Sequence, residues 1–556
     1  MLRRIKMKNK KLIALALILL IVMQCAVYAI AGYSKQYLHP DETLSLGLSQ
    51  YHSADIQKNH DFFGSWHDGS YYKDYLIVNQ DEVNYTQSVR DNQVKNGNAP
   101  LYYFFLRFYM EFSVGSFSMM TSIVLNVMLY TLITLMMFFI VNALFEGKEN
   151  KWWLSLGVTA ASTLILSTLS AVIDIGVYSM LTTFILLIIL IHVVQNRLGK
   201  PNFWTGIASV AAVFLGMLTH YSFLIVLIAL YILFLVRYII DKSIKKIIGY
   251  TLPLLVGFGL SVYVYPESLE HLKYITKASE MGPALYNVKG ALTHAKQYLS
   301  EINKYTFHGL LYIILGVILV CVGIIIAKSI IAKKNGEKKE REKGAYKKLI
   351  SGIVTILVPT LAYFIVYSFT SLKIELKYIY PICALIFVLI AALLVRVAIK
   401  AAGKIGATAI IALTVVAMII LPFAMDIEPK TMYSNREHTV NYIEANKDLP
   451  TVYIYTTKTD SIMDDLYLLT RLENTYITRD WEINSENMTN VFRTRDISRG
   501  VLVIMNDGQE EDAASILTTI MQTLELSEIH AVARLDKANI YYIYNNPDAV
   551  IDPIKD

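Results

Sequence analysis

Eleven long apolar runs constrain the fold of this chain more than any other feature. Each run is about long enough to cross ~30 Å of hydrocarbon as a helix, and a helix satisfies its backbone polar groups internally. With 55% hydrophobic and only 17% charged residues, the chain is also more apolar than soluble globular proteins. We therefore predict a polytopic α-helical membrane protein with about 11 transmembrane helices. The runs are residues 12–32, 118–145, 153–172, 177–195, 203–219, 221–240, 249–265, 307–332, 349–370, 378–398 and 405–425.

Lysine and arginine are distributed unevenly among the loops that join these runs. The loops rich in them are 146–152, 196–202, 237–248, 333–348 and 399–404. The short loops near Asp174 and His220 contain none. The positive-inside rule then places the N-terminus in the cytoplasm and residues 33–117, 266–306 and 426–556 outside. The net charge of +6 reflects this bias, so we expect contact with a membrane surface and none with nucleic acid.

The first apolar run follows a basic start and has the outline of a secretory signal. It is long, however, and no small-x-small cleavage pattern follows it, so we interpret it as an uncleaved first helix. The three cysteines all lie within apolar runs, which excludes a disulfide framework in the outside loops.

From about residue 426 the composition becomes that of a soluble domain. Short β-type runs at 451–456, 475–478, 501–505 and 539–544 alternate with helical stretches, which is typical of a small α/β unit. We predict two domains, a transmembrane domain at 1–425 and an extracytoplasmic α/β domain at 426–556. Within the first outside loop, the segment 101–112 is apolar and aromatic but interrupted by Arg107 and Glu111, which favours an interfacial helix.

The most distinctive local feature is His39-Pro40-Asp41-Glu42, which follows the first helix closely. Proline favours the first turn of a helix and disfavours helix at the residue before it, so both carboxylates are expected in a first turn. On local grounds alone, ordinary helix-start carboxylates explain the pattern better than a functional role. Their position at the membrane surface favours a role in acting on a lipid headgroup.

An Asp-Glu pair directly after the first helix resembles the glycosyltransferase C superfamily, in particular the branch of protein O-mannosyltransferases and bacterial lipid A aminoarabinose transferases. Three further segments are similar to family motifs and occur in the family order. They are Asn98-Ala99-Pro100-Leu101-Tyr102-Tyr103, Leu218-Thr219-His220-Tyr221 and Leu376-Lys377-Tyr378-Ile379-Tyr380-Pro381. The sequence departs from the family at Ala99, at Lys377 and at Gly176, where proline, arginine and arginine are usual.

The resemblance implies a transferase that uses a sugar joined to polyprenyl phosphate. Its leaving group is a phosphate, and the attacking acceptor hydroxyl needs a base. We assign the base to Asp41, with Glu42 orienting it or binding acceptor, and a direct displacement of this kind inverts the anomeric centre. The acceptor class (glycan, lipid or protein) stays open, and the motifs indicate a bacterial cell membrane.

Several other residues are candidates for binding the substrates. Lys377 is the preferred cation for the phosphate and Lys373 is the second choice, although interfacial lysines that reach toward water are common. Asp174 is an ionisable group in an apolar context, which makes it a functional candidate. The remaining candidates are His220, Tyr221 and Tyr102.

The histidines and aspartates of the first outside loop match no compact metal-ligand spacing, so we predict no metal site there. They are His52, His60, His67, Asp61 and Asp68. Whether the protein uses a divalent cation is left open, because some members of the superfamily use one and others do not. The alternatives to an enzyme are a transporter or a non-catalytic assembly protein for a cell-surface polysaccharide, and neither depends on Asp41. Two related halves and broken helices are typical of transporters, and the chain lacks such a pattern.

Overall fold

The computed structural model describes residues 2–50, 61–82, 87–148, 150–277, 287–334, 343–371, 373–455, 462–506, 510–535 and 538–546. The chain forms two compact units. Unit 1 comprises residues Met1–Tyr33, Val94–Tyr102 and Ile123–Lys430. Unit 2 comprises residues Ser34–Gln93, Tyr103–Ser122 and Thr431–Asp556.

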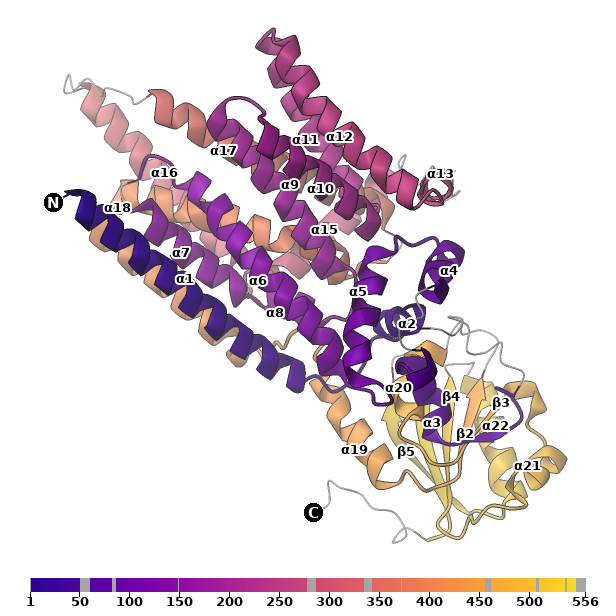
Figure 1. Cartoon of the computed structure of the whole chain (residues 1–556). Coiled ribbons are helices and arrows are strands. Elements are labelled where there is room, and N and C mark those ends of the chain that lie inside the picture. Colours follow the sequence, from indigo (N-terminus) through magenta and orange to yellow (C-terminus); the bar gives the residue numbers. More distant parts are fainter. Residues whose placement is uncertain are drawn as a thin grey trace. The chain divides into compact units, whose positions relative to one another are not determined.

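Unit 1 is a bundle of long apolar helices, and every apolar run of the sequence is helical in it (Figure 1). Within the described residues, eight helices are long and apolar enough to cross a membrane, or nine if the bent pair α7 and α8 is one span. The predicted polytopic membrane protein is thereby confirmed. The helices that contain the apolar runs are α1 (Leu2–Tyr33), α6 (Met119–Leu144), α7 (Lys151–Thr163), α8 (Leu166–Ile173), α9 (Tyr178–Leu198), α10 (Phe203–Thr219), α11 (Phe223–Ile240), α12 (Ile244–Val264), α16 (Leu311–Lys334), α17 (Lys343–Thr370) and α18 (Tyr380–Ala424).

Two features explain why this count is lower than the number of apolar runs. Helix α18 contains two of the runs, joined at Gly403, whose φ of 71° interrupts the helical backbone. Such a φ suits glycine because it has no Cβ. The short helix α10 holds a further run but is below the length of a full span.

The break between α7 and α8 is a bend of 59°. A helix start exposes backbone N–H groups, and in an apolar setting each needs a partner. Here the N–H of Leu166 donates to Nε2 of His308 (3.2 Å), and the His308 Nδ1 lies 2.6 Å from the carbonyl oxygen of Met418. At the other end of α8, the Asn126 amide donates to the carbonyls of Val172 (3.0 Å) and Asp174 (2.6 Å).

Unit 2 is built around a six-stranded sheet with the order β1-β3-β2-β4-β6-β5. The inner pairs β3–β2 and β2–β4 are parallel, whereas β4–β6, β6–β5 and β1–β3 are antiparallel. Every residue of β4 is buried, as expected of a central strand, and the edge strand β5 is mostly exposed. The strands are β1 (Trp66–His67), β2 (Thr451–Tyr455), β3 (Thr475–Arg479), β4 (Val501–Asn506), β5 (Glu528–Arg534) and β6 (Ala538–Tyr544).

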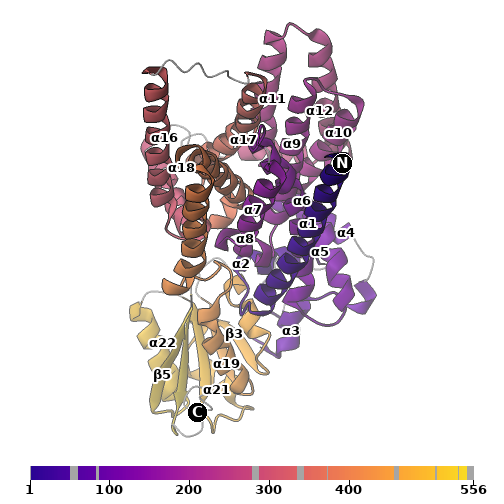
Figure 2. The same ribbon diagram turned by 90° about the vertical axis from the view of Figure 1, so that its left-hand side faces the viewer.

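Helices α21 (Ser485–Phe492) and α22 (Glu510–Thr523) pack on one face of this sheet (Figure 2). Met488 and Phe492 of α21 share a buried apolar core with Ile520 of α22 and Val503 of β4. The predicted α/β character of the C-terminal part is therefore confirmed.

The first outside loop belongs to the same unit as this sheet. Strand β1 pairs Trp66 with Tyr476 and His67 with Thr475 of β3. The indole N–H of Trp66 donates to the carbonyl of Val491 (3.1 Å). The predicted boundary at 425–426 assigned this loop to the transmembrane domain, whereas the compact units group most of it with the C-terminal part.

Candidate functional site

The Asp-Glu pair lies in the first turn of α2 (Pro40–Leu48), in unit 2. His39 is extended, with φ −70° and ψ 149°, as expected before a proline. Its Nδ1 accepts a hydrogen bond from the N–H of Asp41 (3.1 Å), and its own N–H donates to the Glu42 carboxylate (2.7 Å). This reciprocal cap fixes the start of the helix and hence the direction of its first carboxylates.

Glu42 is a buried member of an ion pair. Both of its carboxylate oxygens accept from the Lys35 ammonium, at 2.7 and 2.9 Å, and the two side chains are 0% and 1% exposed. Lys35 also donates to the backbone carbonyl of Thr431 (3.0 Å), at the entry to the C-terminal part. Lys35 therefore links the start of α2 to the chain that leads into the sheet.

Asp41, in contrast, is exposed. Its backbone carbonyl accepts a hydrogen bond from the Ser45 hydroxyl (2.7 Å). Its carboxylate lies close enough to the Tyr103 phenol for the two groups to interact electrostatically. Burial and, secondly, the negative charge of Asp41 raise the pKa of Tyr103 above its ordinary value. The structure thus brings together an accessible carboxylate and a phenol that keeps its proton.

The far end of α2 is held by a polar cluster on α5 (Leu101–Met110). The fully buried Arg107 donates to the Gln50 side-chain oxygen (3.0 Å) and to Glu111 (3.2 Å). In the same segment, Phe108 is 54% and Phe112 is 72% exposed. The interfacial helix expected for 101–112 stays a prediction.

A second group of candidate residues lies in unit 1, where the motifs at 218–221 and 376–381 meet beside Tyr178. The Tyr178 ring is 5.9 Å from His220 and 6.0 Å from Tyr378, between centroids. The Lys377 ammonium lies over the Tyr378 ring (5.5 Å) and forms an ion pair with Glu375. Segments far apart in sequence therefore place a cation, an imidazole and phenol rings in one cluster, which we call the tyrosine cluster.

Further tyrosines extend this cluster along α17. The Tyr363 hydroxyl donates to the carbonyl of Tyr378 (3.1 Å), and the Tyr367 hydroxyl is 2.6 Å from that of Ser222. Burial lowers the pKa of His220 to about 4, so its ring is neutral near pH 7, and its Nδ1 accepts from the N–H of Ser222 (3.2 Å). The cluster offers neutral hydrogen-bonding groups and flat apolar ring faces.

The other predicted site residues lie in different surroundings. Asp174 is buried, and its carboxylate interacts electrostatically with Tyr130 and Tyr380. The Tyr221 hydroxyl is 2.8 Å from Nδ1 of His271, which anchors α13 (Ser268–Lys277). Tyr102 is completely buried and Lys373 is exposed.

The structure shows no group of three or more potential metal ligands among the residues that it describes. The His67 ring stacks on Tyr71 (3.7 Å between centroids), and its Nε2 lies 2.8 Å from the carbonyl oxygen of Asp61. Asp68 caps a short helix by accepting from Ser70. His52 and His60 lie outside the described residues.

Sequence reasoning missed two residues of the α2 site. Nothing in the spacing of Lys35 and Glu42 indicates that they pair, because an extended segment with a proline separates them. Tyr103 was named only as part of the motif at 98–103, and its proximity to Asp41 depends on how the first loop folds back.

Neither the family models nor the curated proteins yield a match to this chain. Among solved structures, it is similar to ArnT from Cupriavidus metallidurans bound to undecaprenyl phosphate, with 12% identity, a TM-score of 0.45, and 96% of this chain and 98% of that chain covered. The apo form of ArnT matches with 10% identity, the same TM-score and the same coverage.

Proposed function

We propose that the chain is a membrane glycosyltransferase that moves a sugar from a polyprenyl-phosphate donor to an acceptor hydroxyl, with Asp41 as the base. The observation that carries this proposal is the unequal environment of the two adjacent carboxylates. Glu42 is buried and ion-paired with Lys35, whereas Asp41 is exposed at a capped helix start. Glu42 supports the geometry of the helix start, and Asp41 is exposed at its surface.

The reaction needs a base more than it needs an acid. The acceptor oxygen forms a bond to the anomeric carbon while the bond from that carbon to the phosphate oxygen breaks. The acceptor proton passes to Asp41, and polyprenyl phosphate leaves as a stable anion. Attack opposite to the leaving group inverts the anomeric centre. Tyr103 keeps its proton at neutral pH and so can donate a hydrogen bond close to Asp41.

We assign the donor phosphate to Lys377 and the neighbouring sugar to the tyrosine cluster. The ammonium of Lys377 provides a positive point charge for a phosphate. It already pairs with an anion, the carboxylate of Glu375, whose place a phosphate would take. The rings of Tyr178 and Tyr378 and the neutral His220 suit a sugar, which has both apolar faces and hydroxyls. Lys373 is the second cation of this assignment.

Asp174, Tyr221 and Tyr102 support this site from buried positions. Tyr221 is engaged with His271, and Asp174 lies at the end of α8. No divalent cation is required by this assignment, since Lys377 supplies the positive charge at the leaving phosphate. We assign the N-terminus to the cytoplasm and the C-terminal part to the outside of a bacterial cell membrane, which the charge distribution of the loops supports.

The test is sugar transfer in membranes that contain the full-length protein, measured with a panel of polyprenyl-phosphate sugars. Asp41→Asn keeps the size of the side chain and removes the base, so we expect transfer to fall by roughly 10²–10⁴-fold. Asp68→Asn is the matched control, because Asp68 is another aspartate at a helix start of the first loop, where it caps the helix, and asparagine caps equally well.

Transfer that survives in Asp68→Asn and is lost in a folded Asp41→Asn variant supports the proposal. An Asp41→Asn variant as active as the wild type refutes the assignment of the base. If the wild type consumes none of the donors, a non-catalytic assembly protein or a transporter is favoured instead.

A further inference from the structure

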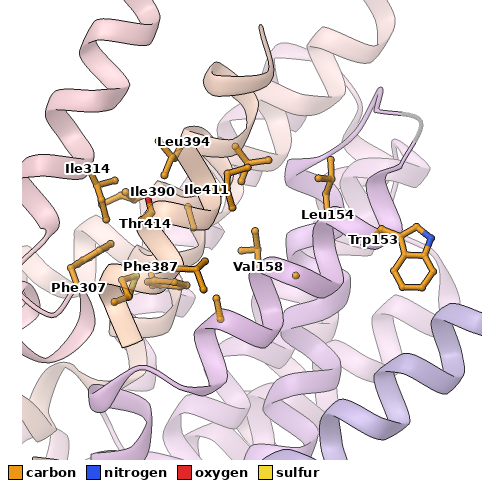
Figure 3. A pocket seen from close by; sticks show the side chains of 16 residues that line it. Trp153, Leu154, Val158, Phe307, Ile314, Phe387, Ile390, Leu394, Ile411 and Thr414 are labelled. Carbon is orange, nitrogen blue, oxygen red and sulfur yellow. The ribbon is translucent and has the colours of Figure 1, made fainter. Parts of the chain in front are cut away.

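An apolar cavity of about 260 Å³ lies in unit 1 between α7, α16 and both halves of α18 (Figure 3). Among its lining residues, only Trp153 and Thr414 carry polar side-chain atoms, and the Thr414 hydroxyl donates to the carbonyl of Ile410 (2.8 Å). An apolar cavity of roughly 150 Å³ stays dry and already admits a benzene ring. This cavity therefore has room for several methylene groups and little affinity for water.

The cavity reaches the outer surface of the helix bundle. Trp153 is 41% and Val415 is 40% exposed, whereas Leu394 on the inner wall is 4% exposed. The helices that line it are spans of the membrane protein, so hydrocarbon chains are the medium at this depth. Gly157 widens the cavity, since a Cβ added there would meet no heavy atom within 4 Å.

The helices that line the cavity carry positive charges at one end. Arg396 follows the lining residues of α18 directly, and its guanidinium donates to the carbonyls of Leu144 (2.7 Å) and Glu146 (3.3 Å). Lys328 of α16 donates to the carbonyl of Ala401 (2.7 Å). The same end of α7 begins with Lys151, two residues before Trp153.

Lys148 joins this group from the loop that precedes α7. Burial and the positive charges of Arg396 and Lys400 lower the pKa of Lys148, which indicates that three cations lie near one another. Among the described residues of this loop, the acid Glu146 pairs with Lys151 (3.4 Å) and Arg197 (3.7 Å). Gathered like charges repel each other, so an anion bound among them stabilises this end of the bundle.

We propose that the cavity binds one acyl chain of an anionic glycerophospholipid whose phosphate contacts Lys148 and Lys400. The loop charges assign this end to the cytoplasmic side, so the lipid comes from the cytoplasmic leaflet. The site is independent of the proposed transferase, because it uses none of the residues assigned to the donor or acceptor.

The experiment uses the full-length protein in phosphatidylcholine vesicles that contain an equal, small fraction of either dibrominated phosphatidylglycerol or dibrominated phosphatidylcholine. Bromine on an acyl chain quenches tryptophan at contact. The signal of Trp153 is the difference between the wild type and Trp153→Phe. We expect stronger quenching of Trp153 by the anionic lipid, with a preference of about fivefold for each lysine. Lys148→Gln with Lys400→Gln should remove this preference.

A matched pair of glycine variants separates the cavity from general surface attraction. Gly157→Leu fills the cavity and should abolish the preference, whereas Gly259→Leu places the same side chain in open space on α12 and should leave it unchanged. Equal quenching by the two brominated lipids in the wild type would overturn the proposal. If Gly157→Leu keeps the preference for the anionic lipid, the cavity does not bind the acyl chain. If soluble glycerol phosphate abolishes the preference, the site binds a free phosphate compound and not a lipid.

Discussion

The buried pair Lys35–Glu42 allows a test of how α2 is held. Lys35→Met removes the ammonium and leaves the Glu42 carboxylate buried without its cation. Breaking a buried pair on one side costs about 3–5 kcal/mol, and the carbonyl of Thr431 also loses a donor, worth about 1 kcal/mol. We therefore expect the melting temperature of the full-length protein to fall by on the order of 10 °C.

The double variant Lys35→Met with Glu42→Met replaces both charges by apolar side chains of similar length. Such replacements are often neutral or stabilising, although the N–H of His39 loses its acceptor. We expect the double variant to unfold within about 2 kcal/mol of the wild type, and thus to be more stable than either single variant. Unfolding is followed by the fluorescence of Trp66 and Trp481 in purified full-length protein.

The exposed pair Lys447–Glu473, with side chains 46% and 53% exposed, provides the control. Lys447→Met should cost no more than about 1 kcal/mol, because solvent screens an exposed pair. If Lys35→Met is as stable as the wild type, or if the double variant is as unstable as the sum of the single ones, the pair does not hold α2. Sugar transfer well below the melting temperature should also fall in Lys35→Met and recover in Lys35→Arg, since the arginine keeps the charge that positions Asp41 through the cap.

Three further predictions concern other parts of the molecule. Lys377→Gln should raise the KM for the donor in the transfer assay, and Lys377→Arg should restore it; an unchanged KM would contradict a phosphate contact. Gly47→Ala should destabilise the protein by about 1–3 kcal/mol, because a Cβ there would lie 2.0 Å from the Tyr75 ring; an equal melting temperature would show that Tyr75 moves aside freely. The folded-state pKa of His220 is depressed to about 4, so the unfolded chain binds the proton first, and stability should fall as the pH drops from about 6.5 toward 4. His220→Gln should weaken this pH dependence of the melting temperature, and an identical pH profile would contradict the burial argument.

The sequence was sufficient to predict the elements whose signal is local. Apolar runs located every spanning helix, and the alternation of β-type and helical runs located β2, β3, β4 and β6. Strand β5 (EIHAVAR) was missed because it is an exposed edge strand that carries no hydrophobic run. Strand β1 was missed because two residues give no pattern at all.

In the candidate site, too, the features with a local sequence signal were predicted and those that depend on tertiary folding were not. The start of α2 followed from Pro40, and the structure has both carboxylates in the first turn, as expected. The partner of Glu42 did not follow, because ion pairs across an extended segment depend on tertiary folding. The tyrosine cluster was approached only through the order of family-like motifs, since no local rule brings Tyr178, His220 and Tyr378 together.

The pairing of β1 with β3 has a consequence for biosynthesis. Residue 66 emerges from the ribosome early, but its strand partner at residue 476 follows only after the spanning helices of the described residues have been made. Contacts between such distant residues form late, because the intervening chain must first be closed into a loop. The first loop can therefore complete its pairing only after the C-terminal part has been synthesised. A nascent chain that stops before residue 475 leaves Trp66 without its strand partner.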